Sequence, residues 1–255
     1  MTGMTNREKY KFDYFTLDHY KEIIALAKQM GFTFISYEQE FDENRKDVLW
    51  RHDVEFSPDV ALKMAQIESD QGVQATYFFQ LHSHYYNTLA KHYTDVFNKI
   101  KDLGHHIGLH FDAHYYDIQT QAELDKYIQL DKKYFEDVMY FHIKVFSFHN
   151  TNPFILSCED FKYGGLINVY SSYFKTHYNY CADSTGYWRY EILDEVILDE
   201  KVQHLQVLTH DAMWTDGEIL SPRKRVRKSV QDSADRVKAM YDDFFLHSPA
   251  KNIDD

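Results

Sequence analysis

Short apolar segments alternate along this chain with longer amphipathic stretches, and this alternation constrains the fold more than any other feature. The longer stretches begin at helix-capping residues and end at glycines. Thr16 begins one that ends at Gly31, and Ser57, followed by Pro58, begins another that ends at Gly72. The apolar segments are rich in aromatic and β-branched residues, which is typical of strands. The sequence therefore predicts strands that alternate with helices.

This alternation can be written as residue ranges. Strands are expected within 47–56, 73–81, 105–111, 143–149, 166–170, 178–183 and 205–210. Helices are expected at about 16–30, 57–71, 87–103, 119–139 and 222–247. Such an order predicts parallel strands with helices outside them, and about seven strands favour a closed or nearly closed α/β barrel. A doubly wound open sheet is the alternative, and in either fold the chemistry lies at the carboxyl ends of the strands.

Length and composition limit the class of protein. A chain of 255 residues with 44% hydrophobic content can bury one substantial core, so we expect a single domain over residues 1–255. No segment approaches the roughly 20 uncharged apolar residues of a membrane helix, and the first residues are polar, so we expect a soluble, cytoplasmic protein.

The two cysteines, Cys158 and Cys181, indicate neither a disulfide framework nor a thiolate zinc site. The formal charge of -12 argues against nucleic acid or an anionic membrane as a partner, and the basic run at 223–228 is expected to be a solvated helical face.

Polar side chains gather where the expected strands end. The residues at these ends are Arg51, His52, Asp53, Glu55, His110, His149, Asp183 and His210. Scattered solvated histidines have no reason to fall at strand ends, whereas groups that converge on one barrel mouth do, so the pattern favours a site. The three tryptophans lie close to these clusters, and their flat faces suit sugar rings or core packing. For Trp50, core packing is the better interpretation.

The segment "WRHDVEF" supplies two carboxylates. Arg51, Asp53 and Glu55 share one face of a strand because alternate side chains point the same way. One carboxylate can hold a cation while the other accepts a proton from water. The alternative is a solvated strand end at which Arg51 neutralises the acids.

The segment "GHHIGLHFDAH" places His110 four residues before His114. With 15 histidines in the chain, about one such spacing is expected by chance, so the spacing alone is weak evidence for a metal site. Two imidazoles and one carboxylate nevertheless form a common ligand set for catalytic zinc, with the fourth position left for water. Asp112 is then expected to orient a neighbour, and His105 and His106 are expected not to bind metal.

Taken in order, the segments "LWRHDVEF", "ATYFF", "LGHHIGLHFDAH", "VFSFHN", "CADSTGYWR" and "LTHDAMW" resemble the polysaccharide deacetylase family, also described as NodB-homology or carbohydrate esterase family 4-like. They are most similar to a branch with an Arg-His-Asp-Val-Asp motif that is associated with surface-polysaccharide synthesis. The resemblance runs from about residue 47 to 214. It implies a distorted (β/α) barrel and a divalent metal, zinc first, with cobalt, nickel or iron as alternatives.

The resemblance also implies roles for individual residues. Asp53 becomes the general base and His210 the general acid, while Glu55, His110 and His114 hold the metal. Further residues are expected to contact or surround the substrate: His149, Asp183, Trp188, Arg189 and Trp214.

This chain departs from the family pattern at several positions. Glu55 stands where the related motif has aspartate, so the two carboxylates can have exchanged roles. The usual arginine of the third motif is absent from "SFHNTNP", and Arg189 is a candidate replacement. Asp211 follows His210 where proline is common, and we expect its charge to favour a protonated His210.

The sequence thus predicts a metal-dependent hydrolase that acts on carbon–nitrogen bonds other than peptide bonds. The expected reaction removes an acetyl or similar acyl group from a sugar or nucleotide sugar. Two alternatives remain open, a hydrolase of small non-sugar amides and a catalytically silent sugar-binding member. The sequence does not indicate the exact substrate or the oligomeric state.

Overall fold

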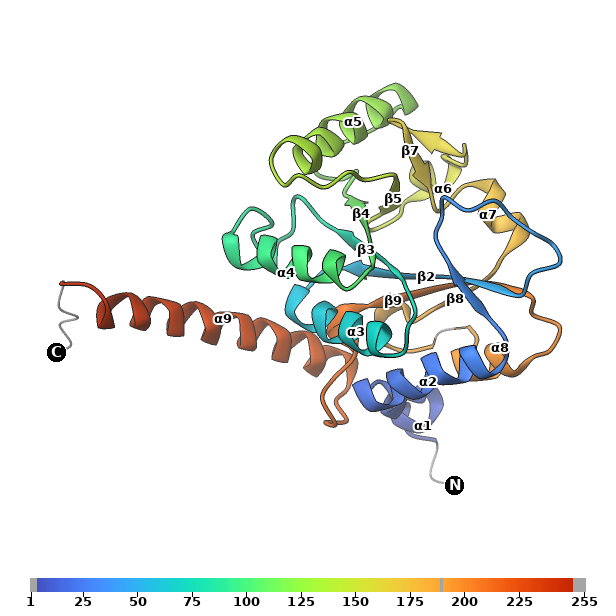
Figure 1. Ribbon diagram of the computed structural model, residues 1–255, viewed down its shortest axis with the longest axis horizontal. Helices are drawn as coiled ribbons and strands as arrows, with labels where there is room; N and C mark the ends of the chain where they lie inside the picture. Colours follow the sequence, from blue (N-terminus) through green and yellow to red (C-terminus); the bar gives the residue numbers. More distant parts are fainter. Residues whose placement is uncertain (1–3, 189, 250–255) are drawn as a thin grey trace.

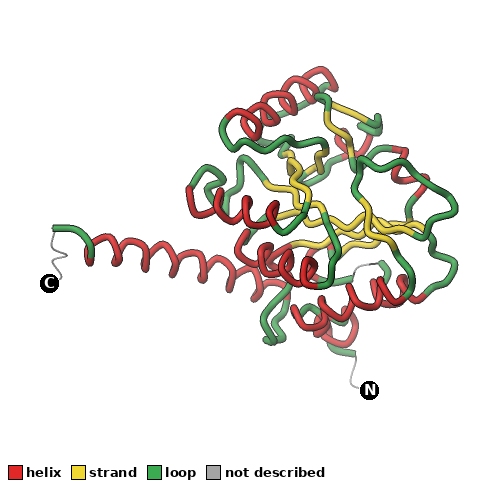
Figure 2. The backbone as a smooth tube through the Cα atoms, in the orientation of Figure 1, coloured by secondary structure: helices red, strands yellow, loops and turns green. Residues whose placement is uncertain are grey.

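The computed structural model describes residues 4–188 and 190–249, and its centre is one curled, mostly parallel β-sheet (Figures 1 and 2). The strands of the described residues are β1 (Thr33–Ile35), β2 (Asp47–Val54), β3 (Thr76–Phe79), β4 (His106–Phe111), β5 (Val145–Phe148), β6 (Lys162–Tyr163), β7 (Leu166–Asn168), β8 (Asn179–Ala182) and β9 (His204–His210). Their order across the sheet is β6-β7-β5-β4-β3-β2-β9-β8, with β1 beside β2.

The sheet forms a half-barrel, so the expectation of a distorted (β/α) barrel is confirmed. All strand pairs are parallel except β6–β7, which is antiparallel. Each of the seven expected strands is present, as β2, β3, β4, β5, β7, β8 and β9. The short strands β1 and β6 were not expected from the sequence.

Helices pack around the sheet. The two expected after Thr16 and Ser57 begin directly at those capping residues, whereas the helix expected from about residue 87 begins at Lys91. The α-helices of the described residues are α1 (Asn6–Tyr10), α2 (Leu17–Gln29), α3 (Pro58–Asp70), α4 (Lys91–Asp102), α5 (Gln121–Asp137), α6 (Pro153–Ser157), α7 (Ser172–His177), α8 (Leu193–Leu198) and α9 (Pro222–Leu246). Three 3-10 turns, η1 (Phe12–Tyr14), η2 (Ser184–Gly186) and η3 (Asp211–Met213), lie between them. The side chain of Thr16 caps α2, and that of Ser57 caps α3. No helix among the described residues is long and apolar enough to cross a membrane.

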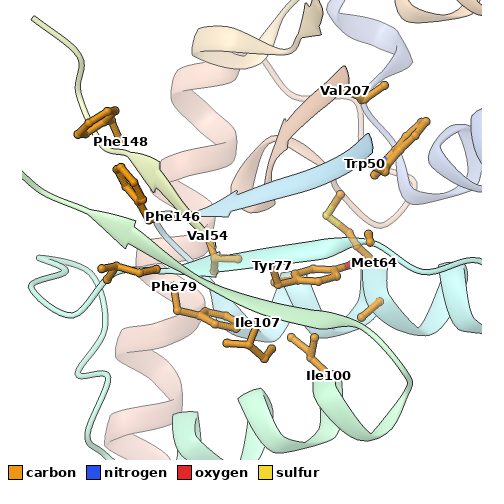
Figure 3. Close-up of a cluster of buried hydrophobic side chains, with 14 of the residues drawn as sticks. Trp50, Val54, Met64, Tyr77, Phe79, Ile100, Ile107, Phe146, Phe148 and Val207 are labelled. Atoms are coloured by element: carbon orange, nitrogen blue, oxygen red, sulfur yellow. The ribbon is translucent and has the colours of Figure 1, made fainter. Parts of the chain in front are cut away.

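The main hydrophobic core lies between the sheet and its helices. Figure 3 shows part of this layer, where Val54, Tyr77 and Ile107 of the strands meet Met64 and Ile100 of the helices. A second cluster, on the other side of the sheet, includes Leu49, Phe78 and Phe174. Strand β2 contributes to both clusters because successive side chains of a strand point to opposite faces.

Close packing against β4 requires a glycine. A Cβ atom on Gly108 would lie 2.6 Å from the ring of Phe78 in β3, too close for any larger residue unless the ring moved. Gly108 therefore lets β3 and β4 fit together two residues before His110.

Strand register brings the polar strand ends together. Asp53 in β2 pairs with His210 in β9, and His110 in β4 pairs with Ser147 in β5. Because side chains alternate along a strand, His149 follows Ser147 on the face that adjoins His110. Residues from four strands thus reach one end of the sheet.

Candidate functional site

Three donor atoms meet at the carboxyl ends of β2, β4 and β5. Glu55 Oε1 lies 3.2 Å from His110 Nε2 and 2.8 Å from His149 Nδ1. The two imidazole nitrogens are 3.2 Å apart. The side chain of His110 is almost fully buried, whereas those of Glu55 and His149 are 17% and 14% exposed. The group is therefore enclosed by protein on one side and open on the other.

This group can hold a metal ion. Zinc held tetrahedrally at about 2.0–2.1 Å from its ligands has ligand atoms about 3.3 Å apart, close to the distances between these three donors. Two imidazoles and one carboxylate also suit zinc and other transition metals better than magnesium or calcium, which prefer oxygen ligands. The donor set fits a divalent transition metal with a remaining position open to solvent.

The ionisation of Glu55 suits a ligand. Burial alone would raise the pKa of this carboxyl, but the hydrogen bonds of His110 and His149 and the charge of His210 hold it well below its usual value. The carboxylate is therefore anionic and available to a cation at neutral pH.

Asp53 lies deeper, behind His110. Its side chain is buried, and Oδ2 accepts a hydrogen bond of 2.9 Å from Ser147 Oγ. The same oxygen lies 3.8 Å from His110 Nδ1 and 3.9 Å from Arg51 Nη2. Among the described residues, no hydrogen-bond partner is present for Asp53 Oδ1 or His110 Nδ1. Asp53 is thus a buried carboxylate in which one oxygen is available to accept a hydrogen bond or a proton.

The cation beside Asp53 comes from its own strand. Arg51 is fully buried, donates to Ser147 Oγ at 3.3 Å, and lies over the ring of Tyr170 at 4.9 Å. The sequence had suggested Arg189 as the arginine of this site, but Arg189 lies outside the described residues. Arg51 is the arginine that neutralises Asp53 in the described structure.

His210 is held by Asp183 of the neighbouring strand segment. Its Nδ1 lies 2.6 Å from Asp183 Oδ1, and its backbone nitrogen donates to Asp183 Oδ2 at 3.0 Å. Burial lowers the pKa of His210, but the charge and hydrogen bond of Asp183, and with them the charges of Glu55 and Asp53, raise that pKa to about 10. His210 is therefore a protonated imidazole at neutral pH, with Asp183 as its partner.

The structure corrects the role expected for Asp211. Its buried carboxylate turns away from His210 and accepts hydrogen bonds from the backbone nitrogens of Glu55, Phe56 and Ser57. The sequence placed Asp211 next to His210 because the two are adjacent in the chain, yet adjacent residues point in different directions. Asp211 instead fixes the backbone from which Glu55 projects.

His114, expected as a metal ligand, is not part of the three-donor group. It follows the end of β4, its Nε2 lies 2.7 Å from the carbonyl oxygen of Asn150, and its backbone nitrogen donates to Asp112 Oδ1. The residue is exposed. His149, expected only near the substrate, lies beside Glu55 and His110 instead. Its position at a strand end, like that of His110, was the available signal for a ligand.

Trp188 and Trp214 lie inside the protein. Both are buried and contact the ring of Phe15, with centroids 5.2 and 4.9 Å away. Trp214 Nε1 also donates to Asp183 Oδ2 at 3.2 Å, so this indole helps to hold the carboxylate that holds His210. The structure thus places both rings in the core behind the site. Trp50 is buried as expected, and its Nε1 donates to the hydroxyl of Tyr20.

No protein-family model matches the sequence, and no curated protein matches it. Among solved structures, a family 4 carbohydrate esterase from Bacillus anthracis is similar with a TM-score of 0.44 and 16% identity, over 84% of this chain and 85% of that one. A CE4 family pseudoenzyme from Bacillus anthracis is similar with a TM-score of 0.42 and 12% identity, over 76% of this chain and 63% of that one. Both are distant likenesses, so the chemistry of this chain is inferred from its own side chains.

Proposed function

We propose that this protein is a metal-dependent hydrolase that removes an acetyl or similar acyl group from a sugar or nucleotide sugar. The observation that carries the proposal is the group of Glu55, His110 and His149, with the buried Asp53 behind it. His210, which is held by Asp183, lies opposite Asp53 in the pairing of β2 with β9. The acylated sugar as substrate rests on the resemblance of the sequence motifs to polysaccharide deacetylases.

Each residue has a part in this proposal. Glu55, His110 and His149 bind the metal, with His114 as the alternative third donor that the resemblance implies. A divalent ion in this position supplies Lewis-acid activation of water and of the substrate carbonyl. Asp53 accepts the proton of the attacking water, and the new bond joins the water oxygen to the carbonyl carbon. As the bond from carbon to nitrogen or oxygen breaks, His210 donates its proton to the departing amine or alcohol.

The surroundings support these two proton-transfer roles. Arg51 Nη2 lies 3.9 Å from Asp53 Oδ2, so a buried cation compensates the negative charge that a base carries before the reaction. His210 is next to an anion, Asp183, which favours its protonated form. A base that begins ionised and an acid that begins protonated are the two states that hydrolysis requires.

The first experiment is a release assay on metal-free protein with and without added zinc or cobalt. The substrates are a panel of N- and O-acetylated sugars, nucleotide sugars and small non-sugar amides, and acetate and ammonia are measured. We expect acetate release from a sugar, only with metal. Release from small amides alone would replace the sugar substrate, metal binding without release would indicate a silent member, and equal turnover without metal would refute the proposal.

The second experiment separates the two carboxylates. Glu55→Gln should lose metal affinity and activity together, because a neutral amide is a poor replacement for an anionic ligand. Asp53→Asn should keep the metal but lose activity by about 10²- to 10⁴-fold, the usual contribution of a positioned general base. Exposed Glu22→Gln and Asp95→Asn are the matched controls. Metal loss only in Asp53→Asn would mean that the two roles are exchanged.

A further inference from the structure

The curled sheet stays open on one side, and a cavity lies in that opening. Strand β8 forms one edge of the sheet, while β7, with the two-residue β6 beside it, lies at the other edge, and α7 connects β7 to β8 along the chain. The cavity has a volume of about 400 Å³ and is lined by residues of α7 and β8, of the segment after β7, and of β2, β9 and α6. Ligand pockets in proteins commonly measure roughly 300–1,000 Å³, so this cavity is large enough for a small organic molecule.

The walls of the cavity are mainly aromatic and aliphatic, with two cations among them. Leu156 and Phe174 contribute apolar side chains. The charged residues among the described lining residues are Arg51 and Lys175, and none of these lining residues is acidic. Lys175 is exposed, and its ammonium already pairs with Glu159 at 2.7 Å. A lining without carboxylates, in a chain of formal charge -12, suits an anionic ligand rather than a cationic one.

Arg51 carries donors that lack acceptors. Its side chain is fully buried, and Nη1 donates to Ser147 Oγ at 3.3 Å. Asp53 Oδ2 lies 3.9 Å from Nη2, which is too far for a hydrogen bond. Burial raises the pKa of Tyr170 and Tyr180 and the charge of Arg51 opposes that rise, so both side chains lie near the guanidinium. Among the described residues, however, none gives Nε or Nη2 a hydrogen-bond partner. Because an unsatisfied buried donor is costly, an acceptor is missing at this point.

The two unpaired nitrogens have the geometry of a carboxylate site. Nε and Nη2 lie along one edge of the planar guanidinium, so their N–H groups can donate in parallel to the two oxygens of one carboxylate. The aromatic walls of the cavity suit the flat or apolar body of the same molecule. Charge, hydrogen bonding and shape therefore indicate one chemical class of ligand.

We propose that this cavity binds a small carboxylic acid with an aromatic or alicyclic body. The carboxylate pairs with Nε and Nη2 of Arg51, and the ring packs against Phe174 and Tyr178. This site is separate from the three-donor group and needs no metal, so it goes beyond the proposed hydrolysis and does not depend on it. Because Arg51 also lies beside Asp53, the ligand and the proposed base would share one cation.

Calorimetric titration of the metal-free full chain tests the ligand class. The probes are benzoate and 2-naphthoate, with acetate, benzamide and inorganic phosphate as comparisons. We expect the two aryl acids to bind with a Kd on the order of 0.1–1 mM, at least about tenfold more tightly than the comparisons. The reason is that only the aryl acids combine a carboxylate with a ring. Absence of binding by the aryl acids, or equal binding by benzamide or phosphate, would overturn the proposal.

Two substitutions test the location of the site. Arg51→Lys keeps the charge but removes the planar fork, so the affinity for benzoate should fall by at least about tenfold. Asn179→Trp, at an exposed lining position of β8, adds an indole to the wall and should weaken binding to a similar extent. Asn44→Trp, at an exposed asparagine that does not line the cavity, is the matched control and should bind as the parent does. Circular dichroism checks that each variant is folded, and Asn179→Trp alone decides if Arg51→Lys is not. Unchanged affinity in a folded variant of either kind would overturn the proposal.

Crystals of the metal-free protein soaked with 4-bromobenzoate show the position directly. We expect the anomalous signal of bromine beside Phe174 and Tyr178, with the carboxylate on Arg51. A bromine bound only elsewhere would overturn the proposal. Because these measurements use neither metal nor an acylated sugar, their failure is distinguishable from failure of the proposed hydrolysis.

Discussion

The carboxylate of Asp183 holds His210 by two contacts, one to Nδ1 at 2.6 Å and one to the backbone nitrogen at 3.0 Å. Trp214 Nε1 donates to the same carboxylate and keeps it in place. The imidazole is thereby fixed with Nδ1 occupied, so that Nε2 is the nitrogen left to exchange a proton with a substrate.

The first prediction concerns the pKa of His210. Burial lowers this pKa, but the charge and hydrogen bond of Asp183, together with the charges of Glu55 and Asp53, raise it to about 10 in the metal-free protein. Asp183→Asn removes the charge, so the pKa of His210 should fall toward or below its usual value of 6.5. An NMR titration of the His210 ring in metal-free protein measures this change. An unchanged pKa would show that Asp183 does not control the protonation of His210.

The second prediction separates His149 from His114. His149→Ala should weaken metal binding by on the order of 100-fold or more, because loss of a supporting partner alone costs 10- to 100-fold. His114→Ala should leave the affinity nearly unchanged, since His114 contacts the Asn150 carbonyl instead of Glu55. Calorimetric titration with zinc measures both, and exposed His142→Ala is the control. The reverse order of effects would favour the ligand set implied by the resemblance.

The third prediction concerns Asp211. Asp211→Ala would leave the backbone N–H groups of Glu55, Phe56 and Ser57 without their acceptor. A buried unsatisfied donor costs about 1–3 kcal/mol, so the free energy of unfolding should fall by about 3 kcal/mol. Metal affinity should also fall, because the backbone of Glu55 is no longer fixed. Urea denaturation measures the first effect, and exposed Asp216→Ala should change stability by less than about 0.5 kcal/mol.

The fourth prediction concerns a buried network on the opposite face of β2. Glu68 lies 2.7 Å from His52 Nε2 and accepts a hydrogen bond from Tyr77, and all three side chains are fully buried. Burial raises the pKa of Glu68, but the charge and hydrogen bond of His52, the charge of His105 and the hydrogen bond of Tyr20 together lower it below its usual value. The stabilisation from Glu68 is therefore complete above its unfolded pKa and lost as the pH falls through its folded pKa.

Glu68→Gln tests this network. The substitution should reduce the free energy of unfolding at neutral pH by about 3 kcal/mol, because it leaves a buried partner uncompensated. The loss should become smaller as the pH is lowered, since the parent protein loses the same contribution. Urea denaturation between neutral and acidic pH measures both, with exposed Glu22→Gln as the control. A stability difference that does not depend on pH would contradict the ionised state of Glu68.

The sequence alone determined the elements of the fold and the location of the chemistry. Capping residues such as Thr16 and Ser57 act through hydrogen bonds to their own next turn, so local sequence is sufficient to place α2 and α3. Strand alternation likewise fixed Asp53 and Glu55 on one face, because that period is a property of the backbone. Parallel strands then carry their ends to one edge, which is why His110 and His210 could be expected there.

Only the tertiary structure decided which of these side chains meet. His149 and His114 were equally available in the sequence, but the β4–β5 register places His149 beside His110, whereas His114 lies beyond the strand, where the turn sets its direction. From the sequence, Asp211 was the residue expected to favour a protonated His210, whereas Asp183 was expected only near the substrate. Asp183 is the partner of His210 because it directly follows β8, which pairs with β9, while the chain turns after His210 and directs Asp211 to the backbone of Glu55. Contacts across strands depend on register and on loop geometry, which the packing of the whole chain sets and a local pattern does not.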